Sequence, residues 1–130
     1  MDKDKATILV VDDDIDILEQ TCLILRSAGY KTLQANGESE ARELLKSSRP
    51  DLAILDLMME HMDSGFILSH QIKKMDPAIP VIIISAVTSQ TGMHFDTSEK
   101  NERSWIKADV FMAKGVRPEQ LIGEVERLLG

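Results

Sequence analysis

The feature that most constrains the fold is a series of five short strand-like runs separated by longer segments. The runs occupy residues 7–11, 31–35, 52–55, 81–84 and 110–113. Four of them are almost wholly apolar, as in strands that helices cover on both faces, whereas the run at 31–35 is more polar. Strands that alternate with helices favour a parallel sheet. The sequence therefore predicts an α/β fold with a doubly wound, five-stranded parallel sheet.

The segments between these runs carry apolar residues at the spacing of an amphipathic helix. Helices are predicted at residues 14–28, 38–47, 65–75 and 118–129. Gly29 provides the left-handed residue that commonly ends a helix, and Pro118 stands at the first helical position, which proline favours. The stretch from 87 to 107 is mostly polar, and we expect a loop there with a short helix around Trp105.

Length and composition indicate one domain over residues 1–130, because a chain with 43% hydrophobic residues can bury a single core. The net charge of −7 and the lack of clustered Lys and Arg argue against direct binding to nucleic acid or to an anionic membrane. The first residues lack the apolar core of an export signal, and no apolar run approaches the roughly 20 residues of a membrane span. The lone Cys22 cannot form an internal disulfide. These observations predict a cytoplasmic protein.

Charged residues follow three of the predicted strands. Asp12 and Asp13 come after the first run, Asp56 after the third and Lys114 after the last, while Asp14 is predicted to cap the first helix. Parallel strands end at one edge of their sheet, which is where open α/β sheets bind ligands. Crowded carboxylates repel one another unless a cation is present, and Mg²⁺ accepts carboxylate, water and phosphate oxygens. The sequence therefore predicts a pocket for a divalent cation and a phosphoryl group.

Four segments, taken in their order and spacing, resemble the receiver domains of bacterial two-component response regulators. They are ILVVDDD at 8–14, PDLAILDLMM at 50–59, VIIISA at 81–86 and FMAK at 111–114. Each segment alone is weakly specific, but the four together are highly specific and cover nearly the whole chain. The resemblance implies a flavodoxin-like (βα)5 fold of the CheY-like type.

The same resemblance implies a role for each acidic residue at the strand ends. Asp56 would be the phosphoacceptor, a carboxylate nucleophile that takes a phosphoryl group from a sensor histidine kinase or a phosphotransfer protein. Asp12 and Asp13 would hold Mg²⁺ together with Asp56 and the backbone carbonyl of Met58. The expected activity is self-phosphorylation and self-dephosphorylation only, so the chain is not expected to be an enzyme acting on other substrates.

The resemblance also assigns the residues that respond to the phosphoryl group. Ser85 would be the switch hydroxyl that bonds it, Lys114 would neutralise its charge, and Phe111 would move with Ser85. The surface made by residues 88–107, the last strand and the last helix would then change and control a downstream protein, which the sequence does not identify.

Three departures from the family pattern keep alternatives open. Gly115 follows Lys114 and Glu60 stands four residues after Asp56, at positions where receivers usually have proline; the stretch between the last two strands is also several residues longer than usual. These departures favour a second hypothesis, a degenerate receiver that binds partners without phosphate. A third hypothesis, an aspartyl-nucleophile phosphatase, is disfavoured because Met58 occupies the position of its second Asp. We expect a receiver that acts alone, although a segment of a longer regulator or hybrid kinase would read identically.

Overall fold

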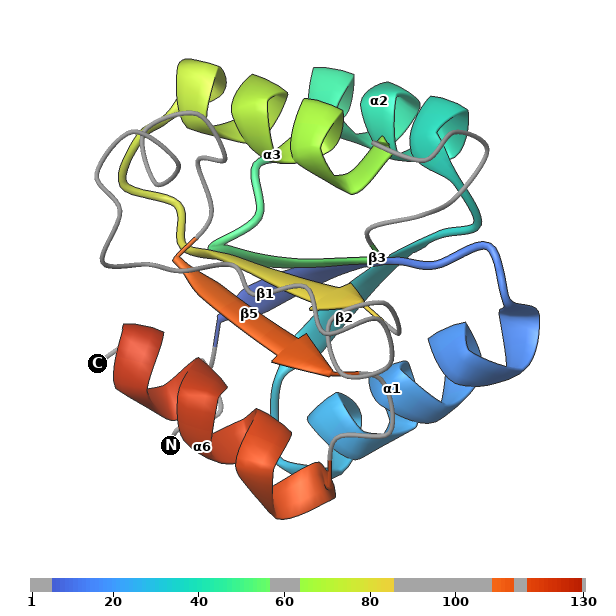
Figure 1. The fold of residues 1–130 in the computed structure, drawn as a ribbon, viewed down its shortest axis with the longest axis vertical. Helices are drawn as coiled ribbons and strands as arrows, with labels where there is room; N and C mark the ends of the chain where they lie inside the picture. Colours follow the sequence, from blue (N-terminus) through green and yellow to red (C-terminus); the bar gives the residue numbers. More distant parts are fainter. Residues whose placement is uncertain (1–5, 57–63, 86–108, 114–116, 130) are drawn as a thin grey trace.

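A computed structural model describes residues 6–56, 64–85, 109–113 and 117–129, and it contains one five-stranded sheet (Figure 1). The strands are β1 (Thr7–Val11), β2 (Lys31–Ala35), β3 (Leu52–Asp56), β4 (Val81–Ser85) and β5 (Val110–Ala113). They lie in the order β2-β1-β3-β4-β5, and every neighbouring pair is parallel. The predicted sheet is confirmed, and β3 and β4 each extend one residue further than the apolar runs.

Helices cover both faces of this sheet, which confirms the doubly wound arrangement. They are α1 (Ile15–Ser27), α2 (Glu38–Ser47), α3 (Ser64–Met75) and α6 (Pro118–Leu129). Figure 1 shows α2 and α3 together on one face and α1 and α6 on the other. None of the helices in the described part of the chain has the length and apolar character that a membrane crossing needs. The short helix expected around Trp105 and the long stretch before β5 lie outside the described residues.

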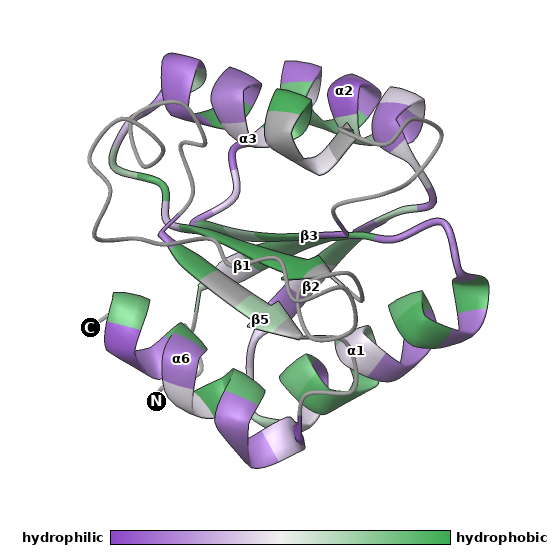
Figure 2. Ribbon diagram, in the orientation of Figure 1, coloured by the Kyte–Doolittle hydropathy of each residue, from purple (hydrophilic) through white to green (hydrophobic). Residues whose placement is uncertain are grey.

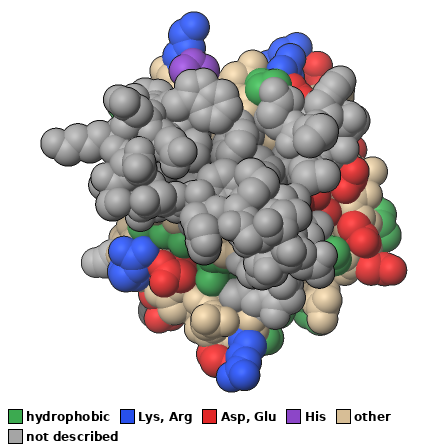
Figure 3. Space-filling model, viewed as in Figure 1, with side chains coloured by type: hydrophobic (Ala, Val, Ile, Leu, Met, Phe, Trp, Pro, Cys, Tyr) green, Lys and Arg blue, Asp and Glu red, His purple; other side chains and the backbone are tan. Residues whose placement is uncertain are grey.

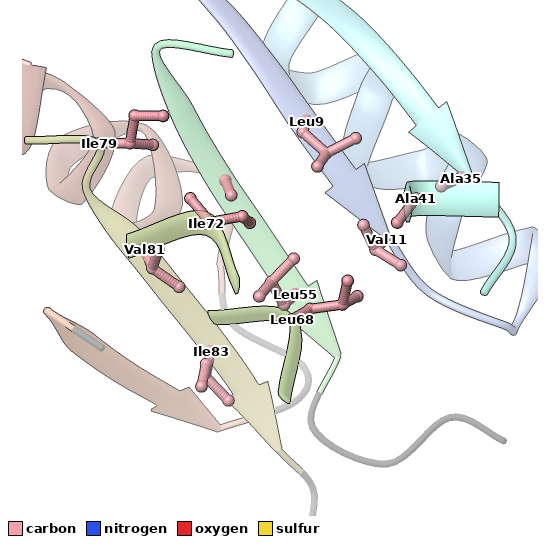
Figure 4. Close-up of a cluster of buried hydrophobic side chains, with 11 residues drawn as sticks. Leu9, Val11, Ala35, Ala41, Leu55, Leu68, Ile72, Ile79, Val81 and Ile83 are labelled. Atoms are coloured by element: carbon pink, nitrogen blue, oxygen red, sulfur yellow. The ribbon is translucent and has the colours of Figure 1, made fainter. Parts of the chain in front are cut away.

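The core is divided by the sheet into two layers, because successive strand residues point to opposite faces. In β1, Leu9 and Val11 pack toward α2 and α3, whereas Ile8 and Val10 pack toward α1 and α6 (Figure 4). Figure 2 shows apolar strands in the middle of the molecule and helices in which polar and apolar residues alternate. Cys22 is fully buried in the layer beside α1, as its helical spacing predicts.

The two ends of α1 explain how the chain turns back toward the sheet. Asp14 is the N-cap, as predicted, and its Oδ1 accepts hydrogen bonds from the backbone N–H groups of Asp16 at 3.0 Å and Ile17 at 3.3 Å. Beyond the other end, Gly29 adopts a φ of 98°, which is the left-handed conformation that glycine allows at low cost. These two residues fix where α1 begins and ends, and therefore where the acidic segment before it lies.

Candidate functional site

The carboxyl ends of β1 and β3 bring three carboxylates together. Val11 and Leu55 are register partners, so the residues that follow them, Asp12 and Asp56, leave adjacent strands at the same level. Asp12, Asp13 and Asp56 each offer a carboxylate oxygen, and these three oxygens lie within 4.8 Å of one another. The predicted convergence of these three residues is therefore confirmed by the geometry.

Strand alternation explains why Asp12 and Asp56 share one side of the sheet. Each continues the series of side chains that points toward α1 and α6, after Val10 in one strand and Ile54 in the other. Asp12 is 5% exposed and Asp56 is 4% exposed, whereas Asp13 is open to solvent. The site thus has two buried carboxylates and a third at its rim.

Hydrogen bonds hold the connection between β1 and α1 in a defined shape. The backbone N–H of Asp14 donates to Oδ1 of Asp12 at 2.9 Å, and the backbone N–H of Asp12 donates to the carbonyl oxygen of Ala35 in β2 at 3.2 Å. One oxygen of Asp12 is thus engaged by its own loop, and the segment is tied to two strands. This arrangement fixes the carboxylates before any ligand arrives.

Asn36 is a residue at this site that the sequence analysis missed. Its side-chain Nδ2 donates to the carbonyl oxygen of Asp12 at 3.4 Å, and its backbone N–H donates to the Glu40 carboxylate in the first turn of α2. In the sequence, Asn36 and Gly37 form a pair that is typical of a turn and carries no other signal. The structure gives this turn a second role, since it links the start of α2 to the segment that carries Asp12.

The chemistry of these ligands fits a hard divalent cation. The described group contains only carboxylate oxygens, which Mg²⁺ prefers, and Mg²⁺ commonly binds one or two carboxylates while keeping several waters. Oxygens on opposite sides of an octahedral Mg²⁺ are about 4.2 Å apart, so a spread of up to 4.8 Å suits an ion held by part of the group, with water completing its shell. Figure 3 shows acidic side chains on the side of the molecule where β1 leads into α1 in Figure 1, so the potential there is negative.

The other predicted site residues are placed only by their strands or not at all. The backbone of Ser85 ends β4, which lies beside β3, and Phe111 lies in β5 opposite Ile83. The carboxyl end of β4 therefore lies next to that of β3, which carries Asp56, and the carboxyl end of β5 lies one strand further away. Lys114 and Met58 lie outside the described residues, as do the two departures from the family pattern at positions 60 and 115. The roles assigned to all of them remain predictions.

Comparison with known sequences identifies relatives along nearly the whole chain. The model of the response regulator receiver domain family matches residues 8–126. The chain is 28% identical over 129 residues to the DNA-binding response regulator MtrA of Mycolicibacterium smegmatis, which covers 99% of this chain and 53% of MtrA. It is 41% identical over 81 residues to the transcriptional regulatory protein GlrR of Escherichia coli, covering 62% of this chain and 18% of GlrR. The chain therefore spans about half the length of MtrA, and less of GlrR.

Solved structures of similar proteins agree with these sequence relatives. A CheY-like receiver domain protein from Methanospirillum hungatei has a TM-score of 0.80 and 25% identity, with 96% of this chain and 94% of that chain covered. The response regulator TrrA from Thermotoga maritima, in complex with Mg²⁺-BeF, has a TM-score of 0.76 and 27% identity, with 95% and 98% covered. The family match runs from the second residue of β1 into the last turn of α6, so it includes all five strands except the first residue of β1. The resemblance found in the sequence is thus confirmed, and the chain belongs to the response regulator receiver domain family, whose members are signalling modules.

Proposed function

We propose that this chain is a phosphorylation-dependent switch in which Asp56 accepts a phosphoryl group in the presence of Mg²⁺. The observation that carries the proposal is the burial of Asp56 at the end of β3 with oxygens of Asp12 and Asp13 within 4.8 Å. Membership of the receiver family supports it, as does the similarity to TrrA, which was solved with Mg²⁺-BeF. We also propose that residues 1–130 act as one receiver domain.

In the proposed reaction, a carboxylate oxygen of Asp56 forms a bond to phosphorus while the bond from phosphorus to the donor breaks. When the donor is a phosphohistidine, the imidazole nitrogen leaves with the bonding electron pair, and the product is an acyl phosphate on Asp56. A bound Mg²⁺ supplies charge neutralisation for the phosphoryl oxygens. Asp12 and Asp13 would hold the Mg²⁺ ion beside Asp56, and the hydrogen bond from the backbone N–H of Asp14 to Asp12 keeps the loop in position.

The proposal extends to the residues and partners that the family resemblance implies. Ser85 and Lys114 would bond and neutralise the phosphoryl group, Met58 would offer its backbone carbonyl to the metal, and Phe111 would follow Ser85. A histidine kinase or phosphotransfer protein would supply the phosphoryl group, and the surface that includes β5 and α6 would pass the signal to a downstream protein. The setting is the cytoplasm, which also suits a chain whose lone cysteine, Cys22, is buried and unpaired.

Incubation with acetyl phosphate, followed by intact-mass spectrometry, tests this proposal. We expect one added phosphate with Mg²⁺ and none when the metal is removed by EDTA. The variant Asp56→Asn should gain no phosphate, because its amide is not a nucleophile of this kind. Asp14→Asn is a matched control, since it removes a nearby charge but keeps a side chain that caps α1 equally well.

Each outcome separates the hypotheses raised by the sequence. Wild-type protein that never gains mass under these conditions would contradict the proposal and favour a phosphate-independent binding module. Steady release of inorganic phosphate without accumulation on the protein would instead favour a phosphatase. An unchanged mass increment in Asp56→Asn would show that the phosphoryl group resides on another residue.

A further inference from the structure

A groove lies between α2 and α3. Its volume is about 420 Å³ and it is open to solvent. It is lined by Arg42, Leu45, Lys46, Gln71, Lys74 and Met75. These six residues define the α2–α3 groove, and each helix contributes three of them.

The α2–α3 groove is basic, although the chain as a whole is acidic. The chain has 15 Lys and Arg residues against 22 Asp and Glu residues, yet three cations and no carboxylate line this groove. Figure 3 shows Lys and Arg side chains at the top of the molecule, where α2 and α3 lie in Figure 1. A local concentration of positive charge on a protein of net charge −7 favours binding of an anionic partner at this surface.

Two cations of the groove are open to a partner from outside the chain. Lys46 pairs with Glu43 at 3.1 Å, and both side chains are 71% exposed, so the pair is screened by water. No carboxylate in the described part of the chain pairs with Lys74. Arg42 pairs with Glu38 within the same helix, and this pair is less screened because the Glu38 side chain is only 13% exposed. Lys46 and Lys74 are therefore available to carboxylates from another molecule.

The groove also has features that a purely ionic surface lacks. Met75 is 42% exposed and Leu45 is half-buried, so apolar surface lies between the cations. Methionine adapts its shape to different apolar groups and is common at surfaces that bind peptides.

We propose that the α2–α3 groove binds an acidic peptide segment of a partner protein, with carboxylates on Lys46 and Lys74 and an apolar side chain against Met75. The open form of the groove favours a peptide over a small molecule, because small-molecule sites enclose most of the ligand surface. This inference goes beyond the proposed phosphoryl transfer and requires neither Asp56 nor its modification.

Fluorescence anisotropy with a fluorescein-labelled peptide of Glu, Leu and Ser tests the proposal on the full chain. The same peptide with Gln in place of every Glu is the uncharged probe. We expect the acidic peptide alone to bind, with an affinity that falls as salt is raised. Amide chemical shifts in a nitrogen-15 NMR spectrum should change along α2 and α3.

Paired variants locate the binding site. Lys46→Gln combined with Lys74→Gln should weaken binding by about tenfold, because two exposed charges that contact the peptide are lost. Lys31→Gln combined with Arg127→Gln removes the same charge from exposed positions on β2 and α6, and it should leave the affinity unchanged.

Equal losses of affinity in the two double variants, or chemical-shift changes away from α2 and α3, would overturn the proposal. The proposal would also be overturned if inorganic phosphate or AMP displaced the labelled peptide at a lower concentration than the unlabelled acidic peptide does. The groove would then be a site for small anions. The variant Asp56→Asn should bind the peptide normally. Failure of the phosphorylation assay and failure of peptide binding are therefore separate results.

Discussion

Replacing Asp56 by Asn should stabilise the metal-free protein, although Asp56 is a buried residue at the centre of the proposed site. Asn has nearly the same shape as Asp and keeps one acceptor oxygen, so the change chiefly removes a negative charge. That charge lies beside two others, since the nearest oxygens of Asp12, Asp13 and Asp56 are within 4.8 Å of one another. The free energy of unfolding should therefore rise when the charge is removed.

The size of the effect follows from the distances and the burial. Two unit charges 4.8 Å apart repel by about 3.5 kcal/mol at an effective dielectric constant near 20. This value applies to the largest separation in the group, and other groups in the site offset part of the repulsion between Asp12 and Asp56, which are 5% and 4% exposed. The contribution from Asp13 is smaller because that side chain is in solvent. We expect a net gain of about 1–3 kcal/mol.

Urea unfolding followed by circular dichroism measures this gain directly. A gain of that size corresponds to a rise of about 1 M in the urea midpoint, given typical slopes of about 1–3 kcal/mol per molar urea. In saturating Mg²⁺ the difference should shrink or reverse, because the metal stabilises the wild-type protein by binding its folded state. Asp14→Asn, which removes a charge outside the group of three, should not stabilise the protein.

Two results would refute the electrostatic reasoning. The first is a lower midpoint for Asp56→Asn than for wild type in EDTA, which would mean that the contacts of the ionised carboxylate outweigh its repulsion. The second is an equal gain in EDTA and in Mg²⁺, which would mean that the metal does not act on this group.

Three further predictions concern the parts of the fold that support the site. Asp14→Ala should lower the free energy of unfolding by about 1 kcal/mol in urea titrations, because it removes the acceptor for two N–H groups at the start of α1; retention of full stability would contradict the capping role. Gly29→Ala should cost about 1 kcal/mol or more in the same assay, since its φ of 98° disfavours any residue with a Cβ, and an increase in stability would count against that reading. Burial raises the pKa of the Cys22 thiol, so at neutral pH the unreactive protonated form prevails; Ellman's reagent should modify it far more slowly in buffer than in urea, and equal rates would show that the layer beside α1 is open.

The sequence was sufficient to predict the sheet and the described helices because local patterns and global packing agree in this chain. Five runs of strand-forming residues alternate with helices that cover both faces of the sheet, and this left few alternative arrangements. The boundaries of α1 were also predictable, since Asp14 and Gly29 are residue types with strong end preferences. Strand ends were less well predicted, because Asp56 and Ser85 continue the strand hydrogen bonding after the apolar pattern has stopped.

The site was predictable in its residues but not in its supporting contacts. Asp12, Asp13 and Asp56 could be grouped because parallel strands end at a common edge. The contribution of Asn36 could not be predicted, since a hydrogen bond to the carbonyl oxygen of Asp12 depends on how two loops approach each other in space. The α2–α3 groove also could not be predicted from the sequence, because its cations are spread over two helices and each one alone is typical of a surface residue.

Chemical mapping of the phosphorylated residue tests the central claim most directly. Sodium borohydride reduces an aspartyl phosphate to homoserine, and tandem mass spectrometry of the digested protein locates the altered residue. After incubation with acetyl phosphate and Mg²⁺, the account predicts homoserine at position 56 and at no other acidic position, with none formed in EDTA. Homoserine at position 12 or 13, or its appearance at position 56 regardless of Mg²⁺, would contradict the assignment of Asp56 as a metal-assisted phosphoacceptor.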